Sequence, residues 1–282
     1  MRKQLLYFAM PILKFMVFVI CLAICVLPVG LFELIPAVKN LDDKYHTVVT
    51  EPLLMVSVLG ALKMMNLMDQ PSTLKSFFIT KKNVFKDVLK GTMFGIVVLS
   101  ICVILMLLTG HVTFSIGKIS IALFFYYILY FLVVALFEEL LGRTYPLFVF
   151  AERYPIALAV LINGLLFGLM HALNPGFTVF AMINIALAGV LFSMFTLYYG
   201  SINWAIGIHL GWNFAQGILF GYKVSGTDTP GVLIAQPKGI YYLSGGQFGV
   251  EGSLICTFVL AVAILCLLLK YKIEPIKESI HS

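Results

Sequence analysis

Long apolar runs alternate with short polar breaks along almost the whole chain. A helix needs about 20 apolar residues to cross the roughly 30 Å hydrocarbon layer of a bilayer. On that criterion the pattern predicts about eight membrane-spanning helices, at residues 5–30, 50–68, 91–110, 119–150, 156–173, 178–199, 202–221 and 252–270. The fold class that follows is all-α, a polytopic helical bundle in a membrane.

Composition excludes a soluble domain. The chain has 282 residues, of which 61% are hydrophobic and only 11% charged, and its mean hydropathy is +1.02. Soluble domains are about one quarter charged. The net charge of +6 is explained by lysines that flank membrane spans, so we expect the lipid bilayer, and no nucleic acid, as a partner.

Basic residues divide unevenly between the two sides of the membrane. If the N-terminus is inside, the cytoplasmic segments hold most of the Lys and Arg residues, including Arg2, Lys3, Lys75, Lys81, Lys82, Lys86, Lys90, Arg153, Lys270, Lys272 and Lys277. The outer segments hold Lys39, Lys44, Lys118, Lys223 and Lys238. The positive-inside rule therefore favours a multi-pass protein with both termini in the cytoplasm, and the basic N-terminus and loops favour a bacterial plasma membrane.

The chain divides into three parts. Residues 1–117 hold the N-terminal spans and a basic segment near 72–90. Phenylalanines stand among lysines in that segment, which indicates either an amphipathic cytoplasmic helix on an anionic leaflet or a solvated loop. Residues 118–252 hold the polar groups described next and form the expected catalytic core, with a Gly- and Pro-rich outer loop after residue 221. Residues 253–282 hold the last span and a cytoplasmic tail.

Two adjacent acids lie inside the fourth apolar run, in the sequence FEELLGR at residues 137–143. Ionisable groups at membrane depth are costly and mark functional sites. Glu139 and Arg143 stand at i,i+4, so they share a helix face and can pair. Glu138 lies about 100° around the helix and has no local cation, which suits a general base.

Two histidines and an asparagine lie on other spans. His171 is in the fifth run, whereas His209 and Asn213 stand at i,i+4 in the seventh and face one way together. A purely structural reading remains possible: the Glu139–Arg143 pair would hold helices together and the histidines would be satisfied polar groups of the bundle.

A depth comparison tests whether Glu138 and His171 can meet. If the fourth helix continues to about Phe150, bends near Pro146 and turns at residues 151–155, Glu138 lies roughly 18 Å and His171 roughly 24 Å from that turn, at about 1.5 Å per residue. The two depths are then comparable, so we expect this longer helix.

The ordered set of Glu-Glu-x3-Arg, Phe-x3-His and His-x3-Asn on membrane helices resembles the CPBP family, which comprises the CAAX prenyl proteases and the bacteriocin-processing or immunity-associated Abi proteins. The resemblance covers about Leu136 to Gly252. It includes GLMHALNP at 168–175, Asn184 with Gly189, and IGIHLGWNFAQGILFG at 206–221. The first three spans match only in general character.

This resemblance implies an intramembrane endopeptidase of the glutamate-dependent type, acting without a cofactor on a membrane-associated or lipidated peptide. By that resemblance Glu138 activates the attacking water, and Glu139 and Arg143 hold it in position. Three side chains would stabilise the oxyanion, namely His171, His209 and Asn213.

Three alternatives remain. A zinc-dependent version would use two histidines and Glu138 as ligands, although the chain has no HExxH motif. A non-catalytic relative would serve as an immunity or partner-binding protein. A transporter could use the buried acids as a proton relay, but the sequence has no inverted repeat.

Overall fold

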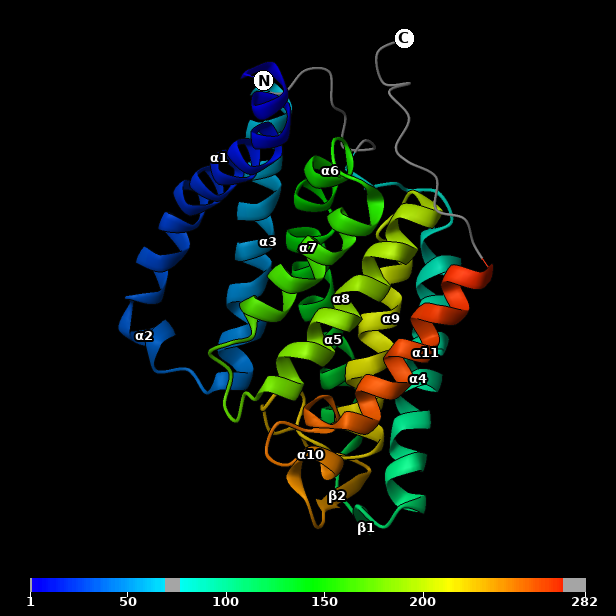
Figure 1. The fold of residues 1–282 in the computed structure, drawn as a ribbon. Helices are drawn as coiled ribbons and strands as arrows, with labels where there is room; N and C mark the ends of the chain where they lie inside the picture. Colours follow the sequence, from blue (N-terminus) through cyan, green and yellow to red (C-terminus); the bar gives the residue numbers. More distant parts are fainter. Residues whose placement is uncertain (1, 69–76, 271–282) are drawn as a thin grey trace.

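The computed structural model describes residues 2–68 and 77–270, and helices make up most of it (Figure 1). The helices of the N-terminal part are α1 (Arg2–Glu33), α2 (Pro36–Lys39), α3 (Asp43–Met68) and α4 (Val84–Leu108). Those that follow are α5 (Ile121–Gly142), α6 (Tyr145–Ala151), α7 (Ile156–Met170), α8 (Val179–Tyr199), α9 (Asn203–Asn213), the π-helix η1 (Phe214–Leu219), α10 (Tyr241–Ser244), the 3₁₀ turn η2 (Val250–Gly252) and α11 (Leu254–Lys270). One antiparallel pair of strands joins β1 (Val112–Ile116) to β2 (Leu233–Pro237).

The helical membrane bundle is confirmed. Within the described ranges, five helical segments are long and apolar enough to cross a membrane: Leu6–Glu33, Tyr45–Met68, Val84–Leu108, Ile121–Ala151 (α5 and α6 together) and Val179–Tyr199. The shorter apolar helices α7 and α11, and α9 continued by η1, cover the other predicted runs. Large apolar side chains such as Leu31, Val56 and Leu129 point outward, as lipid-facing residues do. The number of eight spans stays a prediction.

The two ends of the bundle differ. The start of α1, the start of α4 and α6 lie at one end, whereas β1, β2 and α10 lie at the other (Figure 1). Lys81, Lys82 and Lys86 are exposed just before and within the start of α4. These lysines therefore lie at the same end as the start of α1; the excess of basic residues on one side, and which end faces the cytoplasm, stay predictions.

The basic segment near 72–90 is described only from residue 77. Phe77 and Phe78 form a turn whose rings are buried, with Phe77 packed edge-on against Tyr145 at 5.3 Å. Residues from Val84 onward are the first turns of α4. The described part therefore forms no separate helix, and its aromatic rings contact protein. Residues 72–76 lie outside the described residues, and the division of the chain into three parts stays a prediction.

The fourth apolar run folds as two helices rather than one bent helix. α5 ends at Gly142, Thr144 leaves the helical region (φ −97°, ψ −110°), and α6 carries Pro146 in its first turn. Pro146 has no N–H for the Gly142 carbonyl four residues earlier, and Asn163 Nδ2 donates to that carbonyl instead (2.7 Å). The run reaches Ala151, as predicted, but the break falls before Pro146.

α4 and α9 pack with their backbones close together, because glycines line both sides of the contact. A Cβ atom on Gly95 would overlap the Ile208 carbonyl oxygen, and one on Gly211 would overlap the Thr92 carbonyl oxygen. Small residues that allow close backbone approach are characteristic of membrane helix interfaces. This contact fixes α9, which carries His209.

Replacing Gly95 with alanine is expected to destabilise the bundle by roughly 1–3 kcal/mol, because the added methyl group overpacks a backbone contact. The matched control is Gly30→Ala in α1, where a Cβ would meet nothing within 4 Å. Thermal unfolding in detergent measures both variants. Equal melting temperatures for the two would contradict the close α4–α9 packing.

The outer loop after residue 221 is more ordered than the sequence predicted. It contains β2, α10 and η2, and β2 pairs with β1 in a register that sets Val112 opposite Pro237. The strand pairing was missed because its partners lie far apart in the sequence. The loop covers the end of the bundle nearest the C-terminal end of α9 and returns the chain to α11 (Figure 1).

Candidate active site

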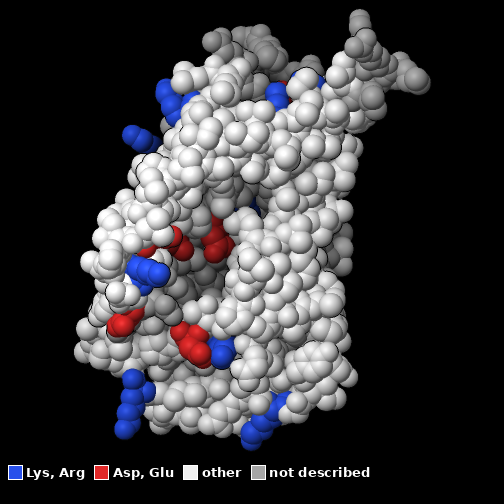
Figure 2. Space-filling view, turned by 90° about the vertical axis from the view of Figure 1, so that its left-hand side faces the viewer, with Lys and Arg blue, Asp and Glu red and all other residues white. Residues whose placement is uncertain are grey.

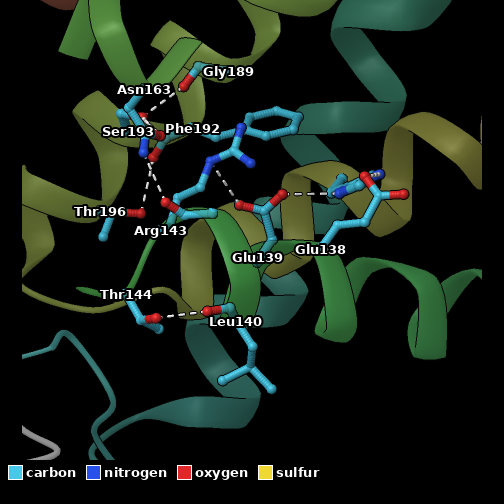
Figure 3. A network of polar contacts seen from close by, with 12 residues as sticks. Glu138, Glu139, Leu140, Arg143, Thr144, Asn163, Gly189, Phe192, Ser193 and Thr196 are labelled. Atoms are coloured by element: carbon cyan, nitrogen blue, oxygen red, sulfur yellow. Dashed lines mark hydrogen bonds and ion pairs between the residues drawn. The ribbon is translucent and has the colours of Figure 1, made fainter. Parts of the chain in front are cut away.

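A fully buried ion pair lies at the junction of α5 and α6. Arg143 Nε lies 3.1 Å from Glu139 Oε2, and both side chains have no exposed surface. The Arg143 guanidinium also stacks on Phe167 of α7, with its Cζ atom 3.8 Å from the ring centroid, a favourable cation–π contact. The pair predicted from the i,i+4 spacing is therefore present (Figure 3).

Glu139 has a second partner on α9. His209 Nδ1 donates to Glu139 Oε1 at 2.9 Å, since a carboxylate can only accept. Glu139 therefore bridges Arg143 and His209. The sequence predicted the pair with Arg143 but not the contact with His209, because helical spacing relates residues within one helix and not between helices.

Glu138 faces the two histidines. Its Oε2 atom lies 3.5 Å from His171 Nε2 and 3.9 Å from His209 Nε2. His171 caps the end of α7, and its Nδ1 donates to the Phe167 carbonyl at 2.9 Å. Both rings are thus held through Nδ1 and present Nε2 to Glu138. The expected meeting of Glu138 and His171 at similar depth is found.

Asn213 completes the set of predicted residues. It is the last residue of α9, directly before the π-helix η1, and only 4% of its surface is exposed. Short π-helical turns occur often at functional sites. His209 and Asn213 both line the cavity that Glu138 and His171 line, so the structure brings these four side chains together.

That cavity measures about 280 Å³ and lies among α3, α5, the end of α7, α9 and the loop after η1. Figure 2 shows this side of the molecule hollowed, with acidic side chains gathered in and around the hollow. Three apolar residues of α5 line part of it, Phe131, Val134 and Phe137. Glu138 therefore opens onto a small, partly apolar cavity with a few polar groups, as ligand sites usually are.

A second hydrogen-bond network, between α7 and α8, lies next to the Glu139–Arg143 pair. Asn163 of α7 accepts from Ser193 Oγ of α8 at 2.8 Å while donating to the Gly142 carbonyl (Figure 3). The break between α5 and α6 is thus tied to α7 and α8. Gly189 of α8 leaves room for Arg143, because a Cβ there would lie 3.2 Å from a guanidinium nitrogen.

Glu251 is a buried acid that the sequence analysis missed. Four donors surround its carboxylate: Trp212 Nε1 (3.2 Å), Gln216 Nε2 (3.1 Å), and the Ser225 N–H and hydroxyl (2.9 Å each). Asn184 Nδ2 donates to the Glu251 carbonyl at 2.6 Å. Because Trp212 and Gln216 flank Asn213, Glu251 fixes the outer loop against the wall of the site. Its place in a Gly-rich loop gave no signal of burial.

Replacing Glu251 with glutamine is expected to destabilise the protein by roughly 1–3 kcal/mol or more. Both oxygens of the Glu251 carboxylate accept hydrogen bonds, whereas the NH₂ group of glutamine cannot accept any, so at least one donor would lose its acceptor. The control is Asp228→Asn in the same loop, an exposed acid whose pair with Lys223 (3.3 Å) should matter little. Thermal unfolding in detergent compares them. A Glu251→Gln variant as stable as Asp228→Asn would show that the loop anchor is unimportant.

No group of three or more His, Cys, Asp or Glu side chains arranged to hold a metal ion is found among residues 2–68 and 77–270. The convergence of the two histidine Nε2 atoms on Glu138 still leaves zinc as the alternative to be tested chemically, because metal-bound histidines also hold their second nitrogen in a hydrogen bond.

Fold and site together define a multi-pass membrane protein with a buried Glu/His centre. The model of the type II CAAX prenyl endopeptidase Rce1-like family matches residues 120–215, a segment that contains all six predicted site residues. The resemblance drawn from the motifs is thereby confirmed, and the match supports an intramembrane CAAX-type protease.

Comparison with curated proteins gave no match, and comparison with solved structures gave none either. The family match therefore supplies the class of protein, and the roles of individual residues are argued from their geometry.

Proposed function

We propose that the chain is an intramembrane, glutamate-dependent endopeptidase that hydrolyses a membrane-associated or lipidated peptide. The observation that carries this proposal is the position of Glu138, whose Oε2 atom lies 3.5 Å from His171 Nε2 and 3.9 Å from His209 Nε2 at the wall of the cavity. Its side chain is 17% exposed, so water in the cavity can reach it. A general base must first of all lie where it can reach the water that it deprotonates, and Glu138 does.

Hydrolysis then follows from the arrangement of the groups. Glu138 takes a proton from a water molecule, and the water oxygen attacks the carbonyl carbon of the scissile bond. When the C–N bond of the tetrahedral intermediate breaks, the proton on Glu138 passes to the leaving amine. One water is consumed, one carboxyl and one amino group are formed, and the Glu138 carboxylate is regenerated.

The oxyanion is stabilised by donors held in place before the reaction. His209 gives its Nδ1–H to Glu139, so its Nε2 faces the cavity and donates to the oxyanion when the ring carries a second proton. His171 also turns its Nε2 toward the cavity, because its Nδ1–H is held by the Phe167 carbonyl, and it donates through Nε2 only when the ring takes up a second proton. Asn213 adds a neutral amide donor one turn beyond His209. Preorganised donors of this kind often contribute most to catalysis.

Glu139 and Arg143 are positioning residues. Their ion pair is fully buried, and through Glu139 it orients His209 toward Glu138. The rest of the proposal concerns location: residues 118–252 form the catalytic core, and the end that carries the basic segments, with both termini, faces the cytoplasm of a bacterial cell.

A cleavage assay tests the proposed function. The protein is purified in detergent and incubated with a library of quenched peptides, with and without a strong chelator. We expect cleavage that survives chelation. Loss on chelation that zinc restores would contradict the glutamate mechanism and make Glu138 and the two histidines zinc ligands. Folded protein that cleaves nothing, together with a Glu138→Ala protein that keeps full activity in its host, would favour the partner-binding role.

A further inference from the structure

A third acid, which the proposed mechanism does not use, lines the same cavity as Glu138. Glu51 lies on α3 and lines the cavity together with Thr47 one turn earlier. Its Oε2 atom is buried and has no hydrogen-bond partner in the described part of the chain. Two carboxyl groups from different helices therefore open onto one cavity of about 280 Å³.

The described lining of the cavity offers Glu51 no permanent cation, because its two histidines face Glu138 instead. None of the described residues that line the cavity is a lysine or an arginine, and Arg143 is already paired with Glu139 behind it. Glu51 thus differs from Glu139 and Glu251, whose oxygens all face a cation or a donor.

A carboxyl group whose buried oxygen has no hydrogen-bond partner is costly. The cost is recovered when a ligand brings a positive charge to the acid, since an ion pair in a place shielded from water is much stronger than one in water. The peptide backbone has no charge to offer, so the charge must come from a side chain of the substrate. The Tyr130 ring, which lines the same cavity, is a suitable neighbour for such a cation.

We propose that Glu51 is a specificity-determining residue that binds a basic side chain, lysine or arginine, next to the scissile bond of the substrate. This inference rests on the proposed function and deepens it, because it names the substrate class. The cavity is at the small end of ligand sites, which span about 300–1,000 Å³, so it holds one or two side chains of the peptide rather than a long segment.

The test compares pairs of peptides that differ only in charge. A peptide cleaved in the library is resynthesised with arginine or with citrulline, its neutral near-isostere, at each position flanking the scissile bond. For the wild type we expect kcat/KM to favour the arginine peptide at one position by roughly tenfold or more, mainly through KM. For Glu51→Gln the ratio should fall toward one, whereas Glu152→Gln, a surface acid paired with Lys14 (3.4 Å), should keep it.

Binding of the same peptides to the Glu138→Gln protein separates this inference from the proposed function. Tighter binding of the arginine peptide, abolished by adding Glu51→Gln, supports the inference even if no hydrolysis is found. Equal binding and equal cleavage of the two peptides by proteins that carry Glu51 would overturn it while leaving the peptidase intact. A Glu51→Gln protein that keeps the arginine preference would overturn it as well.

Discussion

Glu138→Gln protein is expected to lose peptide hydrolysis by roughly 10²–10⁴-fold in kcat, the contribution typical of a positioned general base. The substitution keeps the size of the side chain and removes only its ability to take a proton from water. KM should change little, because Glu138 meets the water rather than the bulk of the peptide. The measurement is steady-state cleavage of a quenched peptide by purified protein in detergent.

The control for this variant is Glu152→Gln, which removes an acid outside the cavity. It should retain wild-type kcat, since its partly exposed ion pair with Lys14 lies outside the cavity and such pairs contribute little. Thermal unfolding must show that the Glu138→Gln protein is folded. A folded Glu138→Gln protein with wild-type kcat would exclude Glu138 as the base and leave the histidines to be considered next.

Arg143→Met protein is expected to lose roughly 3–5 kcal/mol of stability, the usual cost of removing one partner from a buried ion pair. Glu139 would then remain buried without its cation, and the guanidinium would no longer stack on Phe167. A fall in the thermal unfolding temperature in detergent measures the loss, and failure to accumulate folded protein is the extreme form of the same result.

A double variant tells a positioning role from a purely structural one. Glu139→Leu combined with Arg143→Met removes both charges, so much of the stability should return. Activity should not return, because His209 has lost the carboxylate that accepts its Nδ1–H at 2.9 Å. A double variant that is both stable and fully active would show that the pair only holds the helices together.

The sequence predicted most of the fold because long apolar runs identify membrane helices directly. All eight apolar runs are helical, since the cost of unsatisfied backbone groups in lipid leaves the chain little choice. The pairing of Glu139 with Arg143 also followed from spacing alone. Helical geometry further gave comparable depths for Glu138 and His171, which meet at 3.5 Å.

What the sequence could not give depends on contacts between distant segments. The break before Pro146 is stabilised by Asn163 from the next helix, and no local rule placed it at Thr144. Glu251 lies in a Gly-rich loop, whose composition predicts exposure to solvent. In the structure it is buried, and four donors from α9, η1 and the loop surround its carboxylate. Glu51 sits near the start of an apolar run, where an acid normally reaches water, and only the packing of α3 beside α5 turns it toward Glu138.

Single-turnover cleavage in H₂¹⁸O tests the central claim most directly. A peptide is cleaved once by excess wild-type or Glu138→Gln protein, and the new carboxyl group is analysed by mass spectrometry. Direct attack by a water that Glu138 activates predicts one ¹⁸O atom in the wild-type product of the first turnover, and no comparable product from Glu138→Gln. An unlabelled first product with ¹⁸O left in Glu138 would contradict this claim, because it would mean that the Glu138 carboxylate itself attacked the peptide. Equal cleavage by both proteins would also contradict it.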